Sequence, residues 1–279
     1  METIFWGPSG WLFLHTLTFL YPESPTFDDQ TRMNDFIKIT AQILPCKYCR
    51  VSFTKYYQSL PITKFIGSRA TLIEWMYRIH NKVNGKLHRQ HLNSSPNPFL
   101  EKVKKHYAPI IAHINRLISS ENDSENRVRA VVNYICTMGL EFLGSIIFNY
   151  QGYYSNCHTT EEATKIVSVY HSFFNQIVPL IAGFIGINRK RRCYPIRTIL
   201  LRNEGYTKLI KWFYQQNDLI DLDAQFKCYD TYIAFFQKHS VASCNMPSVD
   251  KVKSCSNVKP TKKILGNRTL TLKHTKLDS

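Results

Sequence analysis

Cys46 and Cys49 form the only Cys-x-x-Cys in the sequence, and this pair is the clearest candidate for chemistry. The spacing brings two sulfurs within bridging reach, as a redox dithiol requires, but it also occurs in zinc sites and between unrelated structural thiols. Pro45 suits the first turn of a helix, where free N–H groups favour a thiolate. Zinc would need two more ligands at a recognised spacing, which the downstream histidines do not provide. We therefore rank a redox dithiol above a zinc site, and a zinc site above structural thiols.

A group of polar residues near His80 has the composition of a nucleotide site. His80 and Asn84 are four residues apart and share one helix face. With Asn81 and Lys86 they offer hydrogen-bonding groups and one cation, which suit a ligand with ribose, adenine and phosphates. A solvated helix end explains the same residues, because histidine and lysine are favoured near a helix C-terminus. Taken alone, this group favours the solvated helix end.

Trp11 and His15 form a third group, within the aromatic stretch from Trp6 to Thr16. They also share a helix face, so the indole and the imidazole could stack on a flat cofactor. Core packing with a hydrogen-bonded histidine is the better explanation of this group by itself.

Helices have to position these groups, and apolar residues at three- and four-residue spacing predict them. The predicted helices run over 9–20, 28–44, the stretch with both cysteines, 69–87 and, more briefly, 99–107. Ser9 and Asp28 are the expected N-caps of the first two. Four long helices joined by short loops predict an antiparallel four-helix bundle, so the fold class is all-α.

A polar stretch separates this bundle from further helical patterns. These patterns cover 127–149, 161–187, 198–216 and 222–239. We expect a bundle domain over 1–108, a linker over 109–126, a second helical domain of unknown role over 127–240 and a flexible basic tail over 241–279.

The apolar stretch 166–187 has the length of a membrane span, and the basic run 189–192 follows it. His171, Asn175 and Gln176 interrupt it, and polar residues at mid-span are costly. We therefore favour a buried helix of a soluble domain over a membrane-spanning helix. The N-terminus shows no secretory signal, so we expect synthesis in the cytosol or in an organelle.

The chain carries a formal net charge of +16, with the surplus mainly after residue 92. Such a charge favours anionic partners, namely nucleic acid, a phosphate-bearing cofactor or an acidic membrane surface. It supports an alternative function, a basic non-enzymatic protein that binds nucleic acid or a membrane surface, with the Cys pair structural or on zinc. No known nucleic-acid-binding motif accompanies the charge. The eight cysteines are too sparse for a disulfide scaffold.

Together, the three groups are more specific than any one of them. Their order along residues 5–107 resembles the Erv/ALR family of FAD-linked sulfhydryl oxidases. The matching residues are Trp11, Leu14, His15, Thr16, Tyr21, Pro22, Pro45, Cys46, Cys49, Trp75, His80, Asn81, Val83, Asn84, Lys86 and Leu87. The long second half is similar to the members carried by large DNA viruses, and a viral chain would be expected in the host cytoplasm, the virion or both.

The resemblance implies a four-helix bundle that holds FAD at its mouth, usually in a homodimer. It implies that Cys49 lies against the flavin and that Cys46 meets thiol-containing protein substrates. Electrons would pass through this pair and FAD to molecular oxygen and give hydrogen peroxide. The implied FAD-binding residues are Trp6, Trp11, His15, Trp75, His80, Asn81, Val83, Asn84, Lys86 and Tyr107, and no metal is implied.

The chain departs from the family pattern in three places. The structural disulfide common in the family has no cysteines here to form it, and His88 stands where glycine is usual. Tyr107 stands where tryptophan is common, and a tyrosine can also stack on adenine. Many members carry a second, mobile dithiol. Cys244 and Cys255 are the candidates for it, although two idle thiols are the simpler explanation.

Overall fold

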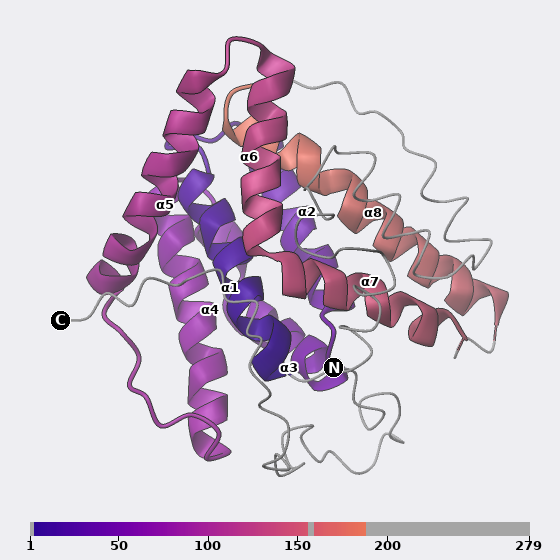
Figure 1. Cartoon of the computed structure of the whole chain (residues 1–279). Helices are drawn as coiled ribbons and strands as arrows, with labels where there is room; N and C mark the ends of the chain where they lie inside the picture. Colours follow the sequence, from indigo (N-terminus) through magenta and orange to yellow (C-terminus); the bar gives the residue numbers. More distant parts are fainter. Residues whose placement is uncertain (1–2, 156–158, 188–279) are drawn as a thin grey trace, which may run out of the picture.

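The computed structural model describes residues 3–155 and 159–187, and within these ranges it contains eight α-helices, one short 3-10 helix and no strand. The elements are α1 (Thr3–Leu20), α2 (Phe27–Ile43), α3 (Lys47–Ser59), η1 (Ile62–Lys64), α4 (Arg69–Arg89), α5 (Leu100–Ser120), α6 (Ser124–Met138), α7 (Leu140–Ser155) and α8 (Thr160–Phe184). The all-α prediction is confirmed for this part of the chain (Figure 1). The helices predicted over 198–216 and 222–239, the tail over 241–279, and Cys244 and Cys255 lie outside the described residues.

The first four α-helices form the predicted bundle. Helix α4 packs against both α1 and α3, and α3 packs against α2. Phe13, Phe36 and Trp75, from α1, α2 and α4 respectively, are fully buried in one apolar core. Each buried phenylalanine contributes about 1.5–3 kcal/mol relative to an exposed one. This core holds the helices that carry the candidate site in fixed positions.

Helix α1 begins at Thr3, earlier than the predicted start at Ser9. Pro8 is tolerated inside the helix because it removes only one backbone hydrogen bond and its side chain is exposed. The Ser9 hydroxyl donates to the Trp6 carbonyl at 3.1 Å and accepts the N–H of Phe142 at 3.0 Å. Ser9 therefore does not cap α1; it satisfies a free N–H in the first turn of α7.

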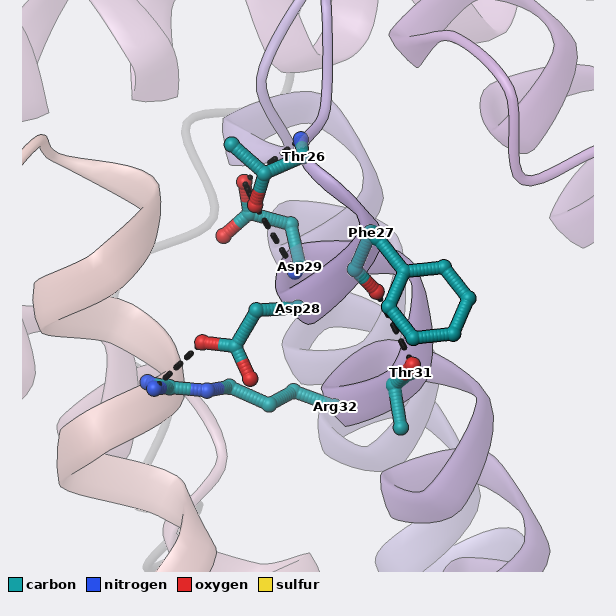
Figure 2. Close-up of polar contacts among 6 residues, drawn as sticks. All are labelled: Thr26, Phe27, Asp28, Asp29, Thr31 and Arg32. Atoms are coloured by element: carbon teal, nitrogen blue, oxygen red, sulfur yellow. Dashed lines mark hydrogen bonds and ion pairs between the residues drawn. The ribbon is translucent and has the colours of Figure 1, made fainter.

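Helix α2 begins with a capping box at Thr26 rather than at the predicted Asp28 (Figure 2). The Thr26 hydroxyl accepts the Asp29 N–H at 3.1 Å, and the Asp29 carboxylate accepts the Thr26 N–H at 2.9 Å. Asp28 instead pairs with Arg32 at 2.5 Å. The prediction was wrong because threonine and aspartate are both good caps and stand two residues apart.

Helix α5 is longer than the predicted fifth helix over 99–107, and most of the predicted linker over 109–126 is helical. Ile110, Ile111 and Ile114 continue the apolar face and pack on the core. Pro109 is a stop signal in the sequence, but the helix passes through it because that packing outweighs one lost hydrogen bond. Only a short loop separates α5 from α6.

The helix predicted over 127–149 is in fact two helices, α6 and α7, bent by 78° around Gly139. A Cβ atom at Gly139 would lie 2.8 Å from the Phe13 side chain of α1. Only glycine allows α1 to approach the bend so closely. The break therefore results from a contact with a distant helix.

Helix α8 confirms the helix predicted over 161–187 and lies against α2, so that α6, α7 and α8 form a second layer on the bundle (Figure 1). Phe173 of α8 stacks on Phe36 of α2 with ring centroids 5.3 Å apart. The Tyr170 hydroxyl donates to the Ile146 carbonyl of α7 at 3.2 Å. By length and composition alone α8 could cross a membrane, and 50% of its most apolar stretch is buried inside the protein.

Candidate active site

The Cys-x-x-Cys lies at the N-terminus of α3, as the sequence predicted. Cys46 is the N-cap residue, and Cys49 lies in the first turn. Both are free thiols in this structure. Cys46 is 2% exposed, whereas Cys49 is half-buried. The pair therefore has the placement of a redox dithiol, with Cys49 the more exposed residue of the two.

Neighbouring groups set the protonation of Cys49. Its hydrogen bond with Cys46 raises the pKa of the Cys49 thiol well above the ordinary value, and burial and the charge of Cys46 add to this. Thr3, with Oγ1 3.8 Å from Sγ, and Lys86 lower the pKa. Lys86 also donates to Ser52 Oγ at 2.9 Å. The helix N-terminus alone thus does not produce a thiolate here: the reduced pair keeps its protons because the two thiols are hydrogen-bonded to each other.

We expect Thr3→Val to slow the alkylation of Cys49 by iodoacetamide by a factor of a few. The variant removes a hydroxyl that stabilises the thiolate, and one such hydrogen bond contributes about 1 kcal/mol or less. Peptide mass spectrometry after timed labelling measures the rate at Cys49. Thr31→Val is the matched control, because its hydroxyl is exposed on α2 and bonded to Phe27. Equal rates in wild type and Thr3→Val would contradict this role of Thr3.

A ring cluster of Trp11, His15, Phe19, His80 and Tyr107 forms where α1, α4 and α5 meet. Trp11 stacks on His80 with centroids 3.9 Å apart and planes at 11°. His15 Nε2 and His80 Nδ1 are hydrogen-bonded at 3.1 Å. Tyr107 stacks on His15 at 5.2 Å and on Phe19 at 4.9 Å. The structure therefore gathers four of the residues that the resemblance implies for FAD.

Both imidazoles of the ring cluster are neutral at physiological pH. Burial lowers the pKa of His15 to about 3, with His80 and His106 adding to the effect. Burial also lowers the pKa of His80 to about 4. One neutral imidazole can then donate to the other. His15 Nδ1 is buried and has no hydrogen-bond partner among the described residues, which fits a ligand that brings its own polar group.

This neutral pair makes folding sensitive to acid. The pKa values of His15 and His80 in the folded state lie below the unfolded value of 6.5. Between about pH 6.5 and pH 4, the unfolded chain therefore binds protons that the folded chain does not. The free energy of unfolding should fall with decreasing pH, by up to about 1.4 kcal/mol per pH unit for each imidazole. Above about pH 6.5 the pair should contribute no pH dependence.

Urea unfolding at several pH values measures this slope. His80→Gln should reduce it, because one of the two buried imidazoles is gone. His91→Asn is the matched control and should leave the slope unchanged, since His91 is exposed and its φ of 56° suits asparagine. If wild type and His80→Gln show the same slope, the buried pair is not its source.

Two of the predicted FAD-binding tryptophans lie outside the ring cluster. Trp75 is fully buried, and its Nε1 donates to the Leu60 carbonyl at 2.8 Å, which ties α4 to the end of α3. Trp6 packs on Phe142 of α7 with centroids 5.9 Å apart. Both therefore support the helices that carry the site.

The other predicted residues are distributed around α4. Asn84 Nδ2 donates to Asn97 Oδ1 at 2.9 Å on the exposed side, and Val83 is half-buried. Asn81 lines a hollow on the outer face of the helix. Lys86 alone of this set acts on the cysteines. The predicted residues of α4 thus face several different parts of the protein.

Sequence reasoning missed Thr3 and Ser52, which contact the Cys pair and Lys86 respectively. Threonine and serine occur throughout the chain, and no spacing distinguishes these two. Their roles depend on contacts between α1 and α3 and between α3 and α4. A prediction of helix packing would have been needed to find them.

Comparison with known proteins confirms the resemblance, since residues 8–108 match the Erv1/Alr family model. The chain is 36% identical over 80 residues to a probable FAD-linked sulfhydryl oxidase of Acanthamoeba polyphaga mimivirus, which covers 28% of this chain and 56% of that protein. It is 37% identical over 83 residues to the mitochondrial FAD-linked sulfhydryl oxidase ERV1 of Saccharomyces cerevisiae, and the aligned stretch covers 30% of this chain and 43% of that protein. It is 26% identical over 85 residues to the FAD-linked sulfhydryl oxidase of African swine fever virus, and the aligned stretch covers 30% of this chain and 70% of that protein. The chain thus spans about half the length of the first two relatives, and no solved structure matches it.

Proposed function

We infer from the Erv1/Alr domain formed by residues 8–108 that this chain is an FAD-dependent thiol oxidase, which makes disulfide bonds in protein substrates. The observation that carries the proposal is that α4 serves both parts of the site. Lys86 of α4 acts on Cys49, and His80 of the same helix lies in the ring cluster. A dithiol and a place for a flat ligand therefore share one element. Relatives named FAD-linked sulfhydryl oxidases support the identity of the cofactor.

The residues present fit FAD. The ring cluster offers aromatic faces for stacking, and the open Nδ1 of His15 offers a hydrogen-bonding position. Lys86 offers a positive charge near the cysteines. We propose that Trp11, His15, His80 and Tyr107 hold the cofactor from the side of the ring cluster. When bound, FAD supplies a two-electron acceptor that passes its electrons to oxygen and gives hydrogen peroxide.

The Cys pair carries out thiol–disulfide exchange with the substrate. A substrate thiolate attacks Sγ of Cys46 in the oxidised pair, the Cys46–Cys49 bond breaks, and Cys49 leaves as a thiolate. The second substrate thiolate then attacks the mixed disulfide and releases Cys46. The substrate has lost two electrons and two protons, and the two cysteines have become thiols. Thr3 and Lys86 favour the first step because they stabilise the departing Cys49 thiolate.

Access to Cys46 is the step that requires movement. Cys46 is 2% exposed in the reduced structure, so a substrate sulfur cannot reach it without displacing its neighbours. Cys49 is the more exposed residue of the two. The assignment of Cys46 to the substrate and Cys49 to the cofactor is thus a proposal about which sulfur reacts first.

A flavin spectrum combined with an oxygen electrode tests the function. The purified protein should be yellow, should release free flavin on denaturation, and should consume oxygen when supplied with dithiothreitol. Hydrogen peroxide should appear in step with the oxygen consumed. A colourless protein from which denaturation releases no flavin would refute the oxidase and leave the basic binding protein as the better explanation.

The family resemblance also supports a homodimer as a proposal. In this chain α8 covers α2, and α6 and α7 cover part of α1. A second copy would therefore meet the molecule through other surfaces than these. Analytical ultracentrifugation of the full chain measures the mass in solution, and a monomer over the whole concentration range would refute the dimer.

A further inference from the structure

The outer face of α4 carries a second candidate site, which we call the α4 groove. It is a hollow of ≈ 430 Å³ lined by Tyr56, Arg78, Asn81, Lys82, Gly85 and Arg89. Arg78, Lys82 and Arg89 recur at four- and seven-residue intervals, so they form one stripe along the helix. At 3.6 residues per turn, His80 points to the opposite side of α4 from Arg89. The α4 groove is therefore separate from the ring cluster.

Positive charge in the α4 groove is only partly balanced. Arg78 pairs with Glu74 and lies over the Phe65 ring at 5.5 Å. In the described part of the chain, neither Lys82 nor Arg89 has a carboxylate within ion-pair distance. Like charges four residues apart, such as Arg78 and Lys82, are unfavourable in a helix. A bound anion would offset this repulsion between the two cations, which would explain why both stand on the same face of α4.

Tyr56 forms the wall of the α4 groove on the α3 side. The Lys82 ammonium lies 6.0 Å from the centre of its ring, and the Arg89 charge acts on its hydroxyl. The cations are thus directed toward α3 and into the hollow. Asn81 adds an amide that can donate a hydrogen bond on the same side.

Gly85 keeps the floor of the α4 groove open. Glycine is unfavourable in the interior of a helix, so a glycine here calls for a reason. Packing does not require a glycine here, because a Cβ atom at Gly85 would meet only Arg89 Nη1, at 3.7 Å. A larger side chain at this position would fill the space between Lys82 and Arg89 instead.

We propose that the α4 groove binds a small phosphate-bearing anion through Lys82 and Arg89. Arginine matches the geometry of phosphate oxygens, and lysine adds a compact charge, which together suit a di- or polyphosphate. A hollow of this size admits a small molecule. The proposal does not depend on the oxidase function.

Isothermal titration of the full, flavin-loaded chain with inorganic pyrophosphate tests the proposal. Lys82→Gln/Arg89→Gln should weaken binding by about tenfold or more, since it removes two charged contacts. Gly85→Leu should weaken binding as well, with no change of charge. Lys102→Gln/Lys105→Gln removes the same charge from the exposed face of α5 and is the matched control, which should bind within about twofold of wild type.

The outcomes separate a built site from general attraction to a basic protein. Equal losses in the two double variants would show that only net charge matters and would overturn the proposal. No measurable binding to wild type would overturn it too. Flavin content, measured from the spectrum of each variant, should be unchanged. If Lys82→Gln/Arg89→Gln loses flavin together with pyrophosphate, the α4 groove is part of the flavin site and the separate site is refuted.

Discussion

Replacing Cys49 by serine will abolish oxygen consumption with dithiothreitol, with a loss of turnover on the order of 10³-fold or more. The serine hydroxyl cannot form the disulfide with Cys46 or leave from it. The ring cluster is untouched, so the variant should keep its flavin and remain yellow. The measurement is oxygen uptake per bound flavin, which separates lost chemistry from lost cofactor.

Cys46→Ser should lose activity to the same extent, and the two variants together test the order of the sulfurs. If Cys46 meets the substrate, Cys49→Ser incubated with oxidised glutathione should form a mixed disulfide at Cys46 and release one glutathione thiolate, and no second protein sulfur is present to displace the adduct. Mass spectrometry of the trapped adduct locates the bond. An adduct only at Cys49 in the Cys46→Ser variant would reverse the assignment, in agreement with the greater exposure of Cys49.

Cys136→Ala is the matched control for a lost thiol. Cys136 is 1% exposed in α6, and burial raises its pKa to about 12. A thiol in these surroundings is inert, so turnover per flavin should stay at the wild-type level. A comparable loss in Cys136→Ala would show that the assay reports folding rather than the chemistry of Cys46 and Cys49.

Phe173→Ala should lower the free energy of unfolding by about 3–5 kcal/mol. Phe173 is fully buried and stacks on Phe36, at the contact where α8 packs on α2. The cavity would lie between the bundle and the second layer, so both should unfold together at a lower temperature. Far-ultraviolet circular dichroism follows the helices, and flavin fluorescence follows release of the cofactor.

Phe27→Ala removes the same side chain from the start of α2, where it is 85% exposed, and should change stability by less than about 0.5 kcal/mol. In Phe173→Ala the loss of helix and the release of flavin should coincide. Helix loss in a separate, earlier step with the flavin still bound would show that the second layer folds independently of the bundle.

Sequence reasoning could predict the helices and the place of the Cys pair, because each depends on local spacing. The bundle and the Cys pair at the start of α3 follow from periodicity and from Pro45. Helix ends were less predictable. Ser9 has the chemistry of a cap, but which helix it caps is decided by the position of Phe142.

The break at Gly139 was missed for a similar physical reason. A glycine inside a helical pattern is a weak signal, and the bend is required only because Phe13 lies against it. In the site, Trp11 and His80 lie together, since stacking needs only that their helices be neighbours. Asn81 is one residue from His80, but it turns by about 100° around α4 and so meets different surroundings.

The hydrogen bond between Ser9 and Phe142 also sets a constraint on biosynthesis. The two residues are 133 positions apart, so the ribosome needs roughly 7–27 s to add the second after the first. During that interval the side of α1 that faces α7 lacks its final cover, because α7 does not yet exist. The nascent chain must therefore shelter these apolar residues by transient contacts or with a chaperone, and α1 reaches its final surroundings only after α7 has left the exit tunnel.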